Sequence, residues 1–171
     1  MKKIAIIASS KDPAGINIRN NLIGLFDFKK LNDKFDGNEV YEFKEIKDKI
    51  IKLYLTNNDL IFSENIDGQI DADIFIFASK HRSKENTPAF TVHGIGNWSS
   101  AEMGGCERKL GHSSAVLMKN IFLELNENAK HANYQITMES THHGPYVEKP
   151  AVFVEIGSTE KEWKDKSNGE I

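Results

Sequence analysis

The stretch I-T-M-E-S-T-H-H-G-P, residues 136–145, decides how the fold is interpreted. It opens as an apolar strand and loses its apolar residues at Glu139, after which it offers a carboxylate, two hydroxyls and the adjacent imidazoles of His142 and His143. A Gly-Pro turn signal closes it. In α/β proteins, ligands bind in the crevice at the carboxyl ends of the strands. We therefore expect this strand end to form the floor of a functional site.

Two other apolar runs end in a similar way. Residues 74–78 are continuously apolar, which is typical of a strand covered on both faces, and they lead to His81. Residues 89–92 predict a strand that leads to His93. If these strands are neighbours and parallel, their carboxyl ends share one edge of the sheet and their histidines converge there with the pair at 142–143.

The two adjacent histidines themselves are expected to diverge. In a strand-like backbone, neighbouring side chains point to opposite faces. On that basis we do not expect His142 and His143 to ligate one metal ion together.

The rest of the chain alternates strand and helix signals, which is typical of an α/β fold. Asp12 is the expected N-cap, and Pro13 the first residue, of a helix that continues to Phe26. Residues 29–38 are polar and are expected to be loop, and 57–59 resemble a hairpin turn. The other expected strands are 3–8, 40–43, 53–55, 60–62, 134–138 and 151–156, and the other expected helices are 113–130 and 160–166, the last capped by Ser158 or Thr159.

Composition narrows the class of protein. A chain of 171 residues suits one domain, or one domain and an incomplete second. Its 39% apolar and 27% charged residues describe an ordinary soluble protein, and no apolar run approaches the length of a membrane span. The single cysteine, Cys106, excludes an internal disulfide and suits the cytoplasm. The net charge of −3 argues against a general nucleic-acid binder, although residues 80–84 form a local basic cluster.

Histidines that converge on one sheet edge would suit zinc. Three protein ligands and an open water position describe a catalytic zinc site. Zinc lowers the pKa of that water, which then attacks an ester or amide carbonyl. Glu139 or Glu102 would move the protons. No H-E-x-x-H motif is present, so this hypothesis rests on the convergence of separate strands.

Six segments, in order along essentially the whole chain, resemble the archaeal and plant type of D-aminoacyl-tRNA deacylase. They are A-S-S-K-D-P-A-G-I-N-I (8–18), F-A-S-K-H-R-S (77–83), F-T-V-H-G-I-G-N (90–97), M-G-G (103–105), E-S-T-H-H-G-P (139–145) and F-V-E-I-G-S-T-E-K-E-W (153–163). The resemblance implies a zinc-dependent hydrolase that cleaves the ester between a D-amino acid and the 3′ end of tRNA. It also implies a three-layer α/β/α sandwich with a mixed, mostly parallel sheet, related to phosphorylase and peptidyl-tRNA hydrolase architectures.

The resemblance further implies roles for particular residues. One or two zinc ions would be held by His81, His93 and His142, with Glu139 and His143 handling protons or orienting the ligands. Backbone N–H groups near the Gly-Gly pair, or at the start of the helix after Pro13, would suit an oxyanion or a phosphate. The residues expected to contact substrate are Asp12, Asn17, Lys80, Arg82, Asn97, Gly104, Gly105 and Thr141.

The expected partners are the aminoacylated acceptor end of tRNA and a D-amino acid, without membrane or DNA. We expect a cytoplasmic monomer in which residues 1–171 form a single α/β catalytic domain, truncated at its C-terminus relative to the family. Two alternatives stay open. One is a phosphorylase-like or peptidyl-tRNA hydrolase-like enzyme, and the other is a non-catalytic module that binds a tRNA end or a nucleotide.

Overall fold

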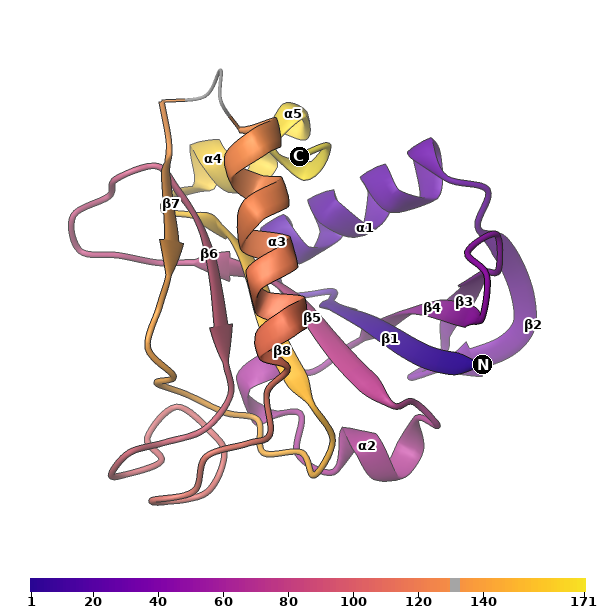
Figure 1. Cartoon of the computed structure of the whole chain (residues 1–171), viewed down its shortest axis with the longest axis horizontal. Helices are drawn as coiled ribbons and strands as arrows, with labels where there is room; N and C mark the ends of the chain where they lie inside the picture. The colour runs from indigo at the N-terminus through magenta and orange to yellow at the C-terminus, as the bar shows by residue number, and fades with distance from the viewer. Residues whose placement is uncertain (130–132) are drawn as a thin grey trace.

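The computed structural model describes residues 1–129 and 133–171, and in them eight strands form one sheet of order β2-β3-β4-β1-β5-β8-β6-β7 (Figure 1). The strands are β1 (Lys2–Ser9), β2 (Lys29–Phe35), β3 (Asn38–Phe43), β4 (Lys49–Thr56), β5 (Ile74–His81), β6 (Ala89–Gly94), β7 (Gln135–Met138) and β8 (Ala151–Gly157). The helices are α1 (Pro13–Leu25), the 3₁₀ turn η1 (Leu60–Phe62), α2 (Ile66–Gln69), α3 (Ala115–Asn128), α4 (Glu160–Lys164) and α5 (Lys166–Gly169).

Strand direction divides the sheet. The central strands β4, β1, β5 and β8 are parallel, whereas β6 is antiparallel to β8 and β7 is parallel to β6. The expectation that the strands before His81 and His93 are parallel neighbours is therefore wrong. The reason is the connection between β5 and β6. Residues 82–88 are too few for a parallel crossover, which needs a dozen or more residues. The expected mixed, mostly parallel sheet is confirmed.

Helical layers cover both faces of the sheet. On one face, Ala14 of α1, Leu125 of α3 and Trp163 of α4 pack with Phe90 and Ile156 of the sheet. On the other face, Leu60 of η1 and Ile66 of α2 pack in a second core that is rich in phenylalanine. Figure 1 shows α3 and α1 lying across the sheet on the same side. The expected three-layer α/β/α sandwich is confirmed.

The expected helix starts are also confirmed. Asp12 caps α1 by accepting hydrogen bonds from the N–H groups of Ala14 and Gly15, each at 3.0 Å. Pro13 is the first helical residue, where a missing N–H costs nothing. Thr159 caps α4 in a reciprocal arrangement with the side chain of Glu162.

Three local expectations are wrong. The polar residues 29–35 form β2, an outer strand whose polarity reflects its exposure. Residues 60–62 form η1 rather than a strand, because a three-residue apolar run does not distinguish the two, and residues 57–59 are consequently not a hairpin turn. The last helix is broken at Asp165 into α4 and α5. Position 130, the expected end of the helix at 113–130, lies outside the described residues.

None of the helices in the described ranges has the length and apolar character that crossing a membrane requires.

Candidate functional site

A cavity of about 430 Å³ opens beyond the carboxyl ends of β1 and β5. η1 and the loops that contain Met103 and His142 supply its other walls. Its lining is Ser9, Asp12, Asp59, Leu60, Ile61, Ser79, Lys80, His81, Arg82, Met103, His142, His143 and Glu155. The mixture of imidazoles, carboxylates and two cations makes it the candidate functional site.

Glu155 is the buried centre of the site. It lies in the middle of β8, opposite Ser79 of β5 and Thr91 of β6. Its Oε2 accepts a hydrogen bond from the Thr91 hydroxyl at 3.0 Å and lies 3.4 Å from His81 Nδ1 and 3.7 Å from His93 Nε2. One carboxylate therefore connects histidines from two strands that run in opposite directions.

Sequence reasoning gave Glu155 no role, although a signal was present. A lone carboxylate interrupts the apolar run 151–156, and a carboxylate in a central strand is almost never fully buried unless it is paired.

His81 lies between two carboxylates. Its Nδ1 is 3.5 Å from Oε2 of Glu139 and 3.4 Å from Oε2 of Glu155. The Oε2 atom of Glu139 is buried and has no hydrogen-bond partner among the described residues. One ligand atom of each of these three residues lies within 4.8 Å of the others. The group can therefore share a proton or hold a cation.

His93, His142 and His143 form a second group. Their ring centroids are 4.6 to 4.8 Å apart, and one ligand atom of each lies within 4.8 Å of the others. The expected divergence of the adjacent histidines is wrong, because β7 ends at Met138 and the backbone that follows is no longer a strand.

Each ring of this trio is oriented by the backbone. Nδ1 of His93, His142 and His143 lies 2.8, 2.8 and 2.7 Å from a carbonyl oxygen of Gly94, Ser140 and Gly144 respectively. A carbonyl oxygen only accepts, so Nδ1 carries the proton and the neutral ring keeps a lone pair on Nε2. Nε2 of His93 is buried, and none of the residues that the structure describes forms a hydrogen bond with it. Metal-binding histidines are oriented in this way.

Burial and neighbouring charges separate the pKa values of the site. For Glu155, burial would raise the pKa, but the imidazoles of His81 and His93 beside the carboxylate lower it well below its usual range. The Glu155 carboxylate beside Nδ1 raises the pKa of His81. For His93, burial opposes the charge on the ring, but Glu155 raises its pKa overall. Burial and the charge of His93 lower the pKa of His143 to about 4. At neutral pH the site therefore holds an ionised Glu155 beside a neutral His143.

Several of the residues expected to bind substrate are engaged elsewhere. Asn17 does not line the cavity, and its amide donates to carbonyl oxygens of Trp163 and Asp165. Asn97 is buried and donates to the Gly104 carbonyl at 2.8 Å. Thr141 does not line the cavity either.

Asp12 does line the cavity, together with Lys80 and Arg82. Its Oδ2 accepts from the N–H of Lys80 at 3.0 Å and from the Ser79 hydroxyl at 3.2 Å. Its other oxygen caps α1, so Asp12 joins the start of α1 to the end of β5. Both carboxylate oxygens of Asp12 therefore accept hydrogen bonds from the protein itself, and these bonds hold the start of α1 against the end of β5 at the cavity.

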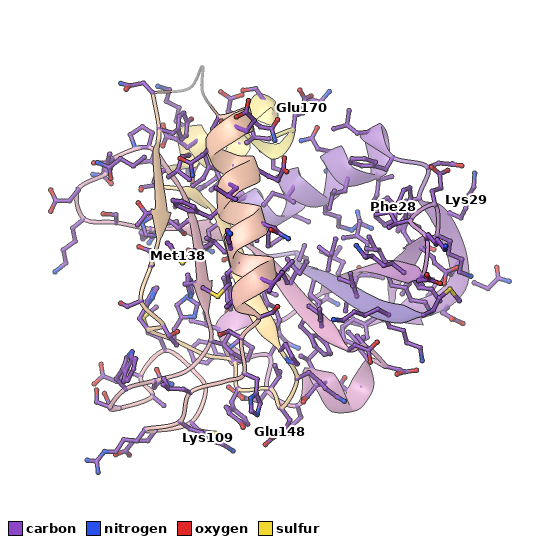
Figure 2. All side chains as sticks on the ribbon, viewed as in Figure 1. Phe28, Lys29, Lys109, Met138, Glu148 and Glu170 are labelled. Carbon is purple, nitrogen blue, oxygen red and sulfur yellow. The ribbon has the colours of Figure 1, made fainter. Side chains whose placement is uncertain are left out.

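Glu64 stabilises the loops that contain Gly105 and Tyr146, and the sequence analysis gave it no role. Its two carboxylate oxygens accept from the N–H groups of Gly105 at 2.6 Å and Tyr146 at 3.0 Å. The N–H of Gly105, expected to be free for an oxyanion, is therefore occupied. Figure 2 shows Lys109 and Glu148 close together in the same loops, and their charged atoms lie 3.5 Å apart. These contacts tie the loop before α3 to the loop after His143.

Replacing Glu64 by Ala should loosen the loop that carries His143. Two charge-assisted hydrogen bonds are lost, and we expect the free energy of unfolding to fall by about 2 kcal/mol. Glu64→Gln keeps one acceptor oxygen and should restore roughly half of that loss. Urea unfolding measures the effect. Glu102→Ala, which removes an exposed carboxylate from the loop that contains Gly105, is the control, and equal stability of the two alanine variants would contradict the role of Glu64.

The fold and the site together define a class: an α/β protein with a cavity whose histidine–carboxylate cluster suits acid–base or metal-assisted hydrolysis. The model of one family, D-aminoacyl-tRNA deacylase, matches residues 68–171. Curated D-aminoacyl-tRNA deacylases of Pyrococcus abyssi and Archaeoglobus fulgidus are each 38% identical over 97% of this chain. The chain belongs to the D-aminoacyl-tRNA deacylase family, which confirms the resemblance seen in the sequence. It covers 61% and 59% of those two relatives, about three fifths of their length.

Solved structures agree with this placement. The chain is similar to the crystal structure of a conserved protein of unknown function, AF0625, with a TM-score of 0.86 and 36% identity, covering 99% of this chain and 60% of that one. It shares its fold with the futalosine hydrolase of Helicobacter pylori at a TM-score of 0.61 and 10% identity, covering 99% and 96% of the two chains. At that identity the likeness concerns the fold alone.

Proposed function

We propose that this chain hydrolyses the ester bond of D-aminoacyl-tRNA and releases a free D-amino acid and tRNA. Family membership gives the reaction class. The observation that carries the proposal is the cluster of four histidines around the buried Glu155 at the cavity. An aminoacyl ester needs a water to add to its carbonyl carbon and a proton for the departing ribose oxygen, and this cluster offers groups for both.

The trio His93, His142 and His143 fits a zinc ion. Each ring is oriented through Nδ1, and His93 Nε2 has no partner, which is the donor set that a zinc site uses. When bound, zinc would lower the pKa of a water and polarise a carbonyl oxygen. Compared with the set expected from the sequence, His143 replaces His81, because His81 groups with Glu139 and Glu155 instead.

We assign proton transfer to the group formed by His81, Glu139 and Glu155. Glu139, whose Oε2 lacks a partner, accepts the proton of the attacking water. His81, held between Glu139 and Glu155 with a raised pKa, donates a proton to the ribose oxygen as the ester C–O bond breaks. Lys80 and Arg82 line the same cavity and supply positive charge for the RNA end. The partners that we propose are the tRNA acceptor end and a D-amino acid. The monomeric state of the chain stays a prediction.

The test compares D-tyrosyl-tRNA with L-tyrosyl-tRNA, with and without a chelator. We expect faster release from the D ester, loss of that release with the chelator, and at least about a 100-fold loss of rate in His142→Ala, since a removed ligand weakens the site strongly. His112→Ala is the matched control, because His112 is an exposed histidine that does not line the cavity. Equal hydrolysis of both stereoisomers contradicts the proposal, and so does tight binding of the tRNA without turnover.

A further inference from the structure

A second cavity, of about 540 Å³, lies next to the first and shares Arg82 with it. It lies beyond the carboxyl ends of β5 and β8, where residues 82–86 meet the start of α4. Its lining includes Arg82, Lys84, Thr159, Glu160 and Trp163. The side chain of Arg82 therefore lies at the border between the two cavities.

Trp163 connects the two cavities structurally. It is buried, and its indole N–H donates to the carbonyl oxygen of His81 at 3.0 Å. The guanidinium of Arg82 lies over the same ring, 5.3 Å from its centroid. One tryptophan therefore fixes the backbone of His81 in the first cavity and the side chain of Arg82 between the two. Stacking leaves the N–H groups on the edge of the guanidinium free to bind an oxyanion.

The charges of the second cavity favour an anion. Within the described residues, neither Arg82 nor Lys84 has a carboxylate within ion-pair distance. The one carboxylate in the lining, Glu160, is paired with Lys164 at 2.7 Å. Two cations therefore face one carboxylate, whose charge is partly offset by its own ion pair with Lys164.

We propose that this cavity binds the phosphodiester that precedes the terminal nucleotide of a single-stranded RNA 3′ end. The inference rests on the proposed function, because that function places the esterified terminal ribose in the first cavity. A polynucleotide whose terminal ribose lies in the first cavity can place its preceding phosphate beside Arg82, the side chain that the two cavities share. Two cations beside a stacked guanidinium match a phosphodiester, whose charge is delocalised over two oxygens.

The test measures binding without turnover. The probe is the 5′-labelled RNA trinucleotide C-C-A, followed by fluorescence anisotropy over a range of salt, and adenosine is the competitor that lacks a phosphodiester. We expect Lys84→Ala and Arg82→Ala each to weaken trinucleotide binding roughly tenfold. Each variant should also reduce the salt dependence, the slope of log K against log salt, by about 0.7 for the lost phosphate contact. For Lys84→Ala, which does not line the first cavity, adenosine binding should change little.

The control removes two cations elsewhere. Lys29 and Lys34 lie on the outer strand β2, and Figure 2 shows Lys29 on the side of the molecule away from Met138 at the end of β7. Lys29→Ala with Lys34→Ala should leave trinucleotide affinity within about twofold, because exposed single charges act weakly at a distance. Equal losses in the control and in Lys84→Ala would mean non-specific attraction and would overturn the proposal.

The outcomes also separate this inference from the proposed function. If the natural chain binds the trinucleotide through Arg82 and Lys84 but hydrolyses no ester, the second cavity stands and the deacylase activity does not. If the chain hydrolyses the ester while both alanine variants keep the trinucleotide affinity and salt slope of the natural chain, the second cavity is not a phosphate site.

Discussion

Glu155→Gln should reduce the rate constant for D-aminoacyl-tRNA hydrolysis by about 1,000-fold, a loss typical of a disabled acid–base system. The amide has nearly the shape of the carboxylate but carries no charge. His81 and His93 would each lose the anion that raises their pKa. His81 would then hold its proton less firmly and face Glu139 alone. The measurement is kcat with saturating substrate, since Glu155 is expected to act on the reacting groups rather than on substrate binding.

The same substitution should also lower stability. Removing one partner of a buried charge pair leaves the other uncompensated, and we expect a loss of about 3 kcal/mol in the free energy of unfolding. Thr91→Val is the matched control. It removes one hydroxyl that donates to Glu155 at 3.0 Å but leaves the carboxylate beside both imidazoles. It should cost about 1 kcal/mol and leave kcat within roughly tenfold. A folded Glu155→Gln protein with the kcat of the Thr91→Val variant would contradict the central role of Glu155.

Much of the fold could be predicted because its signals are local. The apolar run 74–78 and the cap at Asp12 each identify an element through its own composition or end. The errors fall where tertiary context decides. Residues 29–35 are polar because β2 is an outer strand. Residues 60–62 form a 3₁₀ turn in which Leu60 joins the core, whereas Phe62 is exposed.

The candidate site was predictable in its residue types and not in its arrangement. His81, His93 and the pair at 142–143 do gather, but on a sheet face around Glu155, because β6 runs against β8. The short connection of residues 82–88 already excluded the parallel arrangement. Glu64 could not have been found in the same way, since its two partners are backbone N–H groups far away in sequence, at Gly105 and Tyr146.

Gly144→Ala should strongly destabilise the loops of the site. A Cβ at this position would lie 2.2 Å from the backbone N of Gly105, 2.4 Å from the carbonyl carbon of Gly104 and 2.7 Å from the carbonyl oxygen of Ile61. All three are backbone atoms of segments that other contacts hold in place. The added methyl group must therefore separate the loop of His143 from η1 and the Gly-Gly pair. We expect a loss of roughly 3 kcal/mol or more.

Gly24→Ala supplies the matched control for this prediction. Gly24 lies in the last turn of α1, and a Cβ there meets no atom within 4 Å. Alanine is the better helix former, so this variant should gain about 0.5 kcal/mol. Thermal unfolding should therefore move in opposite directions, down by about 10 °C for Gly144→Ala and slightly up for Gly24→Ala. If Gly144→Ala melts with the natural chain, the close approach of these three segments does not exist in solution, and the orientation of His143 that depends on it is lost as well.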